Sequence, residues 1–442
     1  MTLPTSGPLS ISQCVAEFTS ASSNMNSLEQ VILGRAAGQT VSMSEFYGKS
    51  AVIGPPTTQQ GIKLVGTGYI GKSAQGRSVA LSADGNTLAI GAPYDNSFLG
   101  AVWIFTRSNG VWTQQGNKLV GSGSVSGSNT YQGCSVSLNS TGDILAVGGY
   151  GDNSYVGAVW IFTRSNGVWT QQGNKLVGSG YVGTMAYQGC SVSLNSTGDI
   201  LAVGGDADNA NIGATWIFTN SGGVWTQQGN KLVGSGYVGA PSQGYAVSLS
   251  GNGTTLVVGA PADNSNVGAT WIFTNSGGVW TQQGNKLVGS GYNALGANVY
   301  QGCSVSIDST GSIIAFGAYE DDGNVGAAWI FTNSGGVWTQ QGNKLVGSGY
   351  VGTTPYQGIS ISLSGNGTTL AVGGFGDNAF VGATWLFTNS GGVWTQQGNK
   401  LIGSGYVISA QGAGVALDNQ ADTLAVGGYQ DSSEIGAVWI FI

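Results

Sequence analysis

The string Val-Trp-Thr-Gln-Gln-Gly-Asn-Lys-Leu recurs almost unchanged along the chain, and it constrains the fold more than any other feature. Its copies lie 55 to 58 residues apart, and a degenerate first copy occupies 58–64. The lysines of the copies are Lys63, Lys118, Lys175, Lys231, Lys286, Lys344 and Lys400. A second marker, Gly-x-x-Trp-[Ile/Leu]-Phe, also occurs seven times, at Trp103, Trp160, Trp216, Trp271, Trp329, Trp385 and Trp439. Repeats of about this length are typical of propellers and solenoids.

Each repeat contains the pattern of four short strands. In the first repeat, alternating apolar and polar residues predict strands at 76–81, 87–91, 100–106 and 111–120, separated by turns rich in Gly and Asn. The chain has 79 glycines and only 7% charged residues, which suits tight turns better than helices with surface salt bridges. Seven such units predict an all-β fold, a seven-bladed β-propeller of four-stranded antiparallel blades. A linear β-solenoid is the alternative.

The two ends of the repeat region complement each other. After Gln411 only three strands remain before Ile442, whereas 57–66 holds a fourth-strand copy that belongs to no complete repeat. We expect this stretch to pair with 436–441 as the outer strand of the seventh blade, because such pairing closes the ring and removes exposed edges. The propeller is therefore predicted to span 57–442.

Each repeat resembles the unit of FG-GAP-type propellers, the family that includes the integrin α-subunit head. The resemblance rests on Gly-x-Ser-Val-x-Leu-Ser, Leu-Ala-[Ile/Val]-Gly-[Ala/Gly]-[Pro/Tyr] and Gly-Ala-Val-Trp-Ile-Phe, and it covers 57–442. The family commonly has an Asp-x-Asp-x-Asp-Gly calcium loop between the first two strands. This chain instead has Ser82-Ala-Asp84-Gly-Asn86 and Asn139-Ser-Thr-Gly-Asp143, whereas calcium takes six to eight oxygen ligands. We therefore expect plain turns there, with no metal and no other cofactor.

Residues 1–56 contain no copy of the repeat, and Pro55-Pro56 ends them as a stiff linker. Capping-box patterns at 10–13, 26–29 and 42–45 predict three short α-helices. Helices this short are unstable alone in water, so they must pack on the propeller or on a partner. We expect a small helical anchoring segment whose assembly contact is made by Leu9, Val15, Phe18, Phe46 and Tyr47.

The same segment resembles a recurrent N-terminal motif of tailed-bacteriophage virion proteins. The matching stretches are Leu3-Pro-Thr-Ser-Gly-Pro-Leu-Ser-Ile-Ser-Gln-Cys-Val-Ala-Glu-Phe18 and Val41-Ser-Met-Ser-Glu-Phe-Tyr-Gly48, with Cys14 where an aliphatic residue is usual. The resemblance implies attachment through 1–56 to other virion proteins, as part of a head, neck or tail appendage. It also implies several copies in each particle and assembly in the host cytoplasm.

Charge and composition argue against several classes of function. A net charge of -7 without a basic cluster offers no surface for nucleic acid. The absence of histidine removes the commonest general base and the commonest transition-metal ligand, which argues against an enzyme. The first residues lack the features of a signal peptide, and no apolar run reaches about 18 residues. We expect neither a cleavable secretion signal nor membrane insertion.

Two recurring sets of residues have a simple structural interpretation. Cys134, Cys190 and Cys303 share one position, after Gln-Gly, where the other repeats have Arg77, Tyr245, Ile359 and Ala413. Because separate blades hold them too far apart for a disulfide, we expect buried, reduced thiols. An aspartate lies five residues before the Gly of Gly-x-x-Trp, and six of the seven precede a repeat lysine by 23 residues. We expect structural partners of the lysines at Asp95, Asp152, Asp208, Asp263, Asp321, Asp377 and Asp431.

The face that carries function is predicted from where the repeats differ. Turns between the third and fourth strands are nearly identical, whereas the connections at the opposite end vary in length and carry aromatic residues. Loops on a rigid scaffold are where binding usually occurs, although packing at the blade edges is an alternative for these tyrosines. The candidate ligand-binding residues are Tyr69, Tyr94, Tyr155, Tyr181, Tyr237, Tyr292, Tyr350 and Tyr406. We expect a displayed propeller that binds a host-surface glycan or protein; a cellular adhesin or lectin and a purely structural building block are the alternatives.

Overall fold

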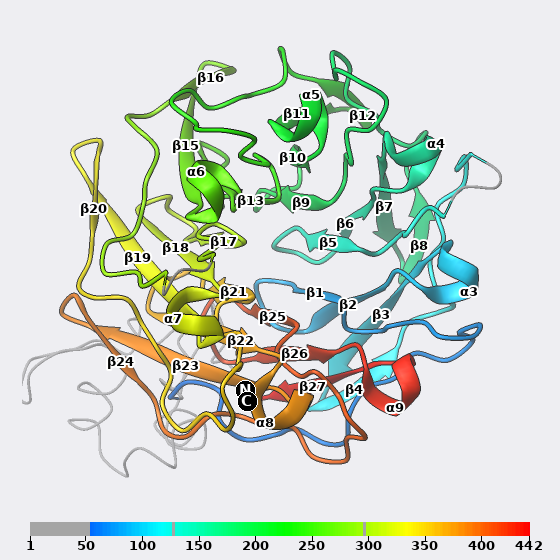
Figure 1. Ribbon diagram of the computed structural model, residues 1–442. Coiled ribbons are helices and arrows are strands. Elements are labelled where there is room, and N and C mark those ends of the chain that lie inside the picture. The colour runs from blue at the N-terminus through cyan, green and yellow to red at the C-terminus, as the bar shows by residue number, and fades with distance from the viewer. Residues whose placement is uncertain (1–53, 126–128, 295–297) are drawn as a thin grey trace, which may run out of the picture. The chain divides into compact units, whose positions relative to one another are not determined.

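The computed structural model describes residues 54–125, 129–294 and 298–442, and the unit Thr57–Ile442 is compact by itself. Its strands form seven small antiparallel sheets around one axis (Figure 1). Innermost strands of neighbouring blades contact one another in a closed cycle, so that the first blade contacts both the second and the seventh. The prediction of a seven-bladed β-propeller is therefore confirmed, and a linear solenoid is excluded. The predicted helices of 1–53 and their apolar residues lie outside the described residues.

Each blade is a meander that runs outward from the axis in chain order. Blade one consists of β1 (Ser78–Leu81), β2 (Thr87–Ala92), β3 (Ala101–Ser108) and β4 (Val111–Gln114). Blades two to four consist of β5 (Ser135–Leu138), β6 (Ile144–Gly149), β7 (Ala158–Ser165), β8 (Val168–Gln171), β9 (Ser191–Leu194), β10 (Ile200–Gly205), β11 (Ala214–Ser221), β12 (Val224–Gln227), β13 (Ala246–Leu249), β14 (Thr255–Ala260), β15 (Ala269–Ser276) and β16 (Val279–Gln282). Blades five to seven consist of β17 (Ser304–Ile307), β18 (Ile313–Ala318), β19 (Ala327–Ser334), β20 (Val337–Gln340), β21 (Ser360–Leu363), β22 (Thr369–Gly374), β23 (Ala383–Ser390), β24 (Val393–Gln396), β25 (Gly414–Leu417), β26 (Leu424–Gly428) and β27 (Ala437–Phe441).

A single helical turn joins the second and third strands of every blade. Each turn begins at the repeat aspartate, and two residues inside it have positive φ, such as Asn96 at 50° and Ser97 at 55°. Left-handed residues follow no helical periodicity, so the hydrophobic pattern does not predict these turns. They are α3 (Asp95–Phe98), α4 (Asp152–Tyr155), α5 (Asp208–Asn211), α6 (Asp263–Asn266), α7 (Asp321–Asn324), α8 (Asp377–Phe380) and α9 (Asp431–Glu434).

The fourth strand is shorter than the alternation at 111–120 predicts. β4 ends at Gln114, and pairing resumes only at Leu119, which bridges Val102. Gly116 lies between them with φ of 70°, a left-handed conformation that interrupts the ladder. The outer edge of each blade is therefore two short pairings with a bulge between them.

The core lies between the blades, because the second and third strands bury both faces. Val102 and Ile104 of blade one pack in one cluster with Val147, Trp160 and Phe162 of blade two. The alternate residues of β2 and β3, among them Ile90 and Trp103, pack against blade seven. Two buried faces explain why these strands are almost continuously apolar.

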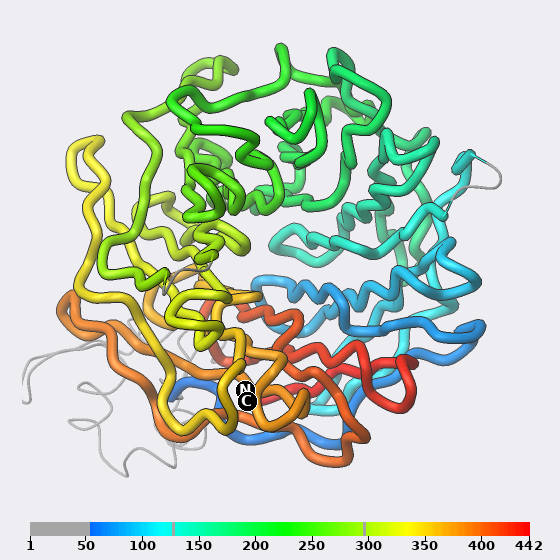
Figure 2. Tube along the Cα trace, in the orientation of Figure 1, coloured from blue at the N-terminus to red at the C-terminus, as the bar shows by residue number. Residues whose placement is uncertain are grey.

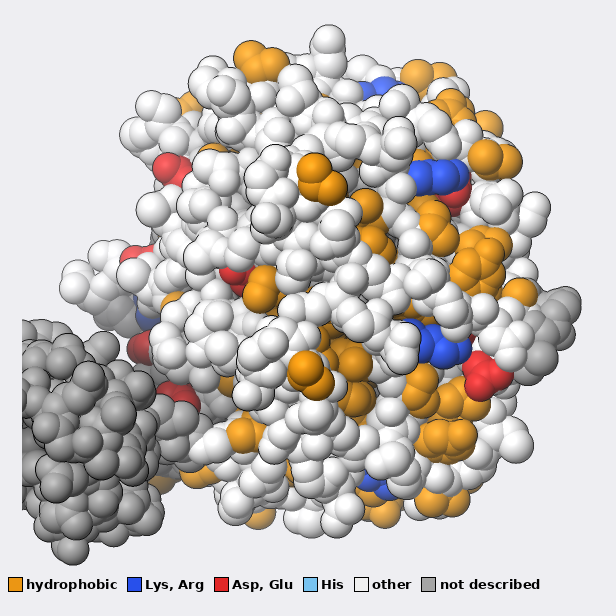
Figure 3. All heavy atoms as spheres, turned by 90° about the vertical axis from the view of Figure 1, so that its left-hand side faces the viewer, with side chains coloured by type: hydrophobic (Ala, Val, Ile, Leu, Met, Phe, Trp, Pro, Cys, Tyr) orange, Lys and Arg blue, Asp and Glu red, His pale blue; other side chains and the backbone are white. Residues whose placement is uncertain are grey.

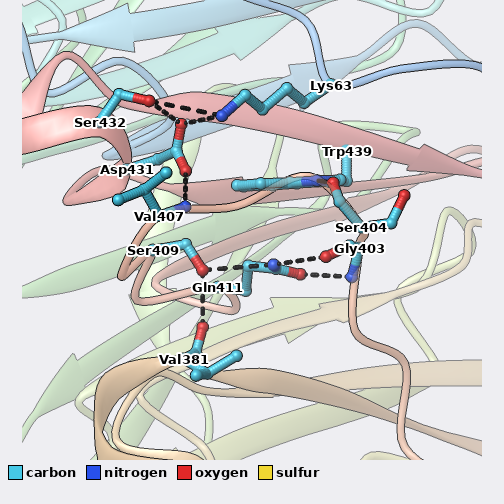
Figure 4. A network of polar contacts seen from close by, with 10 residues as sticks. All are labelled: Lys63, Val381, Gly403, Ser404, Val407, Ser409, Gln411, Asp431, Ser432 and Trp439. Carbon is cyan, nitrogen blue, oxygen red and sulfur yellow. Dashed lines mark hydrogen bonds and ion pairs between the residues drawn. The ribbon is translucent and has the colours of Figure 1, made fainter.

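A clamp made of three repeated residues fixes each connection between blades. In the last blade, the amide of Gln411 accepts a hydrogen bond from Gly403 N at 2.6 Å and donates one to Gly403 O at 2.9 Å (Figure 4). Trp439 Nε1 donates to Ser404 O at 2.7 Å. A Cβ on Gly403 would lie 2.0 Å from Trp439 Cδ1, so only glycine lets the chain pass over the indole. This geometry explains the recurrence of Val-Gly-Ser or Ile-Gly-Ser after the repeat lysine.

The seventh blade is completed by the start of the propeller sequence. Its sheet has the three strands β25, β26 and β27, and Gln59 and Leu64 bridge Phe441 and Val438 of β27 in antiparallel fashion. In Figure 2 the blue start of the described chain runs beside the red C-terminal strand. Lys63 Nζ lies 2.5 Å from Asp431 Oδ2, which gives the seventh blade the same ion pair as the others (Figure 4).

Candidate functional site

The main cavity of the propeller lies on its axis, at the end where the helical turns and the connections between blades lie. Its volume is about 660 Å³. The residue after Gln-Gly in every repeat lines it: Arg77, Cys134, Cys190, Tyr245, Cys303, Ile359 and Ala413. The sevenfold repeat thus builds a ring of equivalent positions that holds five kinds of side chain: Arg, Cys, Tyr, Ile and Ala. This volume lies within the range of about 300 to 1,000 Å³ that is usual for small-molecule sites.

Tyrosines on one side of the cavity form a continuous wall. We call Tyr94, Tyr131, Tyr150, Tyr155 and Tyr187, from blades one to three, the aromatic arc; all five line the cavity. Tyr131 stacks on Tyr150 with ring centroids 4.9 Å apart, and Tyr155 and Tyr187 continue the series at 5.4 Å. A second aromatic series recurs at the equivalent positions of blades five and six, where Tyr300 stacks on Tyr319 at 5.3 Å and Tyr356 on Phe375 at 5.2 Å, but these rings do not line the cavity.

The backbone under part of the arc is held in an unfavourable conformation. Tyr131 and Tyr187 each have φ of 57°, in the left-handed region that bulky residues rarely adopt. The equivalent residues Ala74, Ser242, Tyr300, Tyr356 and Ala410 have the same conformation, so it belongs to the repeat. Because three of the seven carry small side chains, the turn does not require an aromatic ring.

Only two of the residues that line the cavity are charged, namely Arg77 and Asp206. Asp206 is partly buried, and burial raises the pKa of its carboxyl group. The thiols of Cys134 and Cys303 donate to Gly189 O and Gly358 O, both at 3.3 Å. Burial raises the pKa of Cys134 to about 11 and that of Cys303 to about 12, so these thiols stay protonated and weakly nucleophilic.

The three cysteines in the ring of equivalent positions are free thiols. Cys14 lies outside the described residues. The expected reduced state is confirmed for these three; Cys303 is buried as expected, whereas the residues Cys134 and Cys190 are partly exposed.

The structure separates the predicted tyrosines into two groups. Tyr94 and Tyr155 line the axial cavity. The other six lie in the connections between blades, with 37–39% of each side chain exposed, and none of them lines the cavity: Tyr69, Tyr181, Tyr237, Tyr292, Tyr350 and Tyr406. Such uniform exposure follows the repeat, and we call these six the rim tyrosines.

The repeat aspartates hold the connections that carry the rim tyrosines. All seven are fully buried, and each forms an ion pair with a repeat lysine: Asp95, Asp152, Asp208, Asp263, Asp321, Asp377 and Asp431. The second carboxylate oxygen accepts a backbone N–H from the connection; Asp208 accepts from Val182 N at 2.6 Å, next to Tyr181. These contacts place the aspartates within the framework of the blades.

Sequence reasoning did not select Arg77, Asp206, Tyr150 or Tyr245 as site residues, although they line the cavity. Each stands at a position where the repeats differ. Asp206 occupies the place held elsewhere by Pro93, Tyr150, Pro261, Tyr319, Phe375 and Tyr429. Variation between the repeats at axial positions is the signal that identifies them, and Asp206 is the one acidic residue at its position.

Comparison with protein-family models and with curated proteins gives no match for this chain. Within the described residues, no cluster of three or more His, Cys, Asp or Glu side chains could hold a metal ion. The turns between first and second strands use their oxygens internally; Asp84 accepts hydrogen bonds from Ser82 Oγ and Asn86 N, at 2.5 and 3.0 Å. None of the helices in the described ranges is long and apolar enough to span a membrane.

Proposed function

We propose that this protein is a non-catalytic carbohydrate-binding propeller, displayed on a virion, that recognises a host-surface glycan in its axial cavity. The observation that carries the proposal is the aromatic arc: of the aromatic rings that recur near the axis, the five tyrosines of blades one to three line an open cavity.

The chemistry of the arc suits a sugar ring. Tyrosine offers a flat apolar face, on which the C–H face of a pyranose can stack, and a hydroxyl that can exchange hydrogen bonds with sugar hydroxyls. The cavity also presents Ser78, Ser191 and Ser360 as further polar contacts. A volume of about 660 Å³ accommodates one or two sugar units at the end of a glycan.

The outer surface supports display rather than charge-driven binding. Figure 3 shows few charged side chains among the described atoms of that view; hydrophobic side chains gather toward its right-hand side, and uncharged polar atoms cover most of the rest. Placement on a virion rests on the resemblance of 1–56 to the phage motif, and the FG-GAP likeness of the repeats agrees with an adhesive role. Several propellers on one particle would convert weak single-site affinity into strong attachment.

The test is binding of the full-length chain to an array of immobilised host-type glycans. We expect at least one glycan to bind, and the double variant Tyr150→Ala/Tyr187→Ala to lose most of that binding. The matched control, Tyr181→Ala/Tyr350→Ala, removes two rim tyrosines and should leave binding unchanged. Thermal unfolding of both variants checks that the fold is retained.

The outcomes are distinct. Failure of the wild-type chain to bind any glycan would contradict the proposal and favour a structural building block. If Tyr181→Ala/Tyr350→Ala loses glycan binding and Tyr150→Ala/Tyr187→Ala keeps it, the binding site lies at the rim tyrosines and not in the axial cavity.

A further inference from the structure

Arg77 is the one cation of the described ranges whose side chain forms neither an ion pair nor a hydrogen bond. Each lysine described forms an ion pair with a carboxylate. Arg107 and Arg164 donate hydrogen bonds to Asn86 and Gln115, among others. The Arg77 guanidinium lies over the ring of Tyr429, 5.9 Å from its centroid. Its N–H donors are available to a ligand in the axial cavity that it lines.

The Asp206 carboxylate contacts the Cys190 thiol, but one of its acceptor atoms has no hydrogen bond. Its Oδ1 atom is buried and receives no hydrogen bond. Six of the seven repeats place a proline or an aromatic residue at this position, so the fold does not require a carboxylate there. A buried acceptor without a donor is unfavourable, and a ligand hydroxyl that enters the cavity would supply the missing hydrogen bond.

The two groups and the aromatic arc together define the class of ligand. One guanidinium can bind a carboxylate through two parallel hydrogen bonds, and it matches the charge of a monoanion. A phosphate monoester carries nearly two negative charges, whereas the cavity lining contains one cation and one acidic residue. Hydroxyl donors for Asp206 and a flat C–H face for the arc are properties of a pyranose.

We infer that the axial cavity binds a sugar acid, with its carboxylate on Arg77, a hydroxyl donated to Asp206 and its ring against the aromatic arc. This inference rests on the proposed function and names the ligand of the same site. It requires that acidic sugars bind there more tightly than neutral sugars of the same shape.

The experiment compares each acidic glycan with its carboxyl-reduced counterpart, in which the carboxylate has become a primary alcohol. Glycans that end in glucuronic, galacturonic or N-acetylneuraminic acid are titrated against the full-length chain, each beside its reduced form. We expect at least one acidic glycan to bind about 10-fold or more tightly than its reduced form, the size of effect expected for a charge-assisted hydrogen-bonded pair. Arg77→Gln should bring the two affinities to the same value.

Lys72→Gln is the matched control. Lys72 lies five residues from Arg77, pairs with Glu434 at 3.1 Å and does not line the cavity. Its replacement removes the same unit charge and should leave the preference for the acid intact. If Arg77→Gln and Lys72→Gln lose the preference for the acidic glycan equally, the preference is a long-range charge effect and the inference is overturned.

Other outcomes separate the inference from the proposed function. Equal affinity for acidic and reduced glycans, with binding still dependent on the aromatic arc, overturns the sugar-acid assignment and leaves carbohydrate binding standing. Binding of no glycan, acidic or neutral, overturns both.

Discussion

Replacing Asp418 by asparagine is expected to stabilise the propeller, and increasingly so as the pH rises. Asp418 lies in the turn between β25 and β26, is only 4% exposed, and lines a smaller cavity of about 160 Å³ at the other end of the axis. Burial raises its pKa from 3.8 to about 6. The same turn position holds asparagine in blades two and three, at Asn139 and Asn195, so the substitution suits the local geometry.

The sign and size of the effect follow from proton linkage. Between pH 4 and 6 the folded state holds a proton on Asp418 that the unfolded state has lost, so stability falls as the pH rises through this window. A shift of about 2 pKa units corresponds to about 3 kcal/mol at pH 7 and above. Asparagine carries no charge and avoids this loss. With an unfolding entropy of about 2.1 cal/mol/K per residue, about 390 residues give a rise in Tm of roughly 4 °C.

The assay is thermal unfolding of the wild type and Asp418→Asn from pH 4 to pH 8. The difference in Tm should be near zero at pH 4, grow through pH 6 and then level off. Asp308→Asn is the matched control in blade five, where the carboxylate accepts backbone hydrogen bonds from Ser312 and Ile313 at 2.7 and 2.8 Å. We expect no gain there. A pH-independent difference, or a loss of stability in Asp418→Asn at pH 8, would refute the reasoning.

Three further predictions test the framework. Gly347→Ala places a Cβ 2.1 Å from the Trp385 indole and should lower the free energy of unfolding by well over 3 kcal/mol. Gly349→Ala, with open space around it, should lower it by only about 1 to 2 kcal/mol, because its φ is positive. Equal losses of stability in denaturant titrations would contradict the clamp. Lys175→Met leaves a fully buried aspartate unpaired and should cost about 3 to 5 kcal/mol, and a neutral result would show that the pair is dispensable. Deletion of 1–66 should give insoluble protein or an open ring, whereas deletion of 1–55 should not, because only the longer deletion removes the strand that bridges β27. Equal solubility and equal Tm of the two truncated proteins would show that the ring closes in another way.

The repeat made the architecture predictable because every blade carries the same signals. Seven tryptophan markers and seven lysine markers fix the number of blades, and period-2 alternation locates most of the strands. Prediction failed at local left-handed residues. The bulge at Gly116 shortens β4, and the positive φ of Asn96 and Ser97 builds the turn α3 where no helical period exists.

The candidate site was only partly predictable, for a related physical reason. The search for common features finds the rim tyrosines, which recur once in most repeats and are equally exposed. Tyr94 and Tyr155 were found among them because they also lie in connections. Arg77 and Asp206 were not, because each is a single exception within the repeat and its importance depends on the strand end that faces the axis.

The most direct test of the account is an experimental structure of the full-length chain with a bound host-type glycan. The account predicts the terminal sugar in the axial cavity, with its ring against Tyr150 and Tyr187 and a carboxylate within hydrogen-bond distance of Arg77. A glycan bound at the rim tyrosines, with the cavity empty, would contradict it.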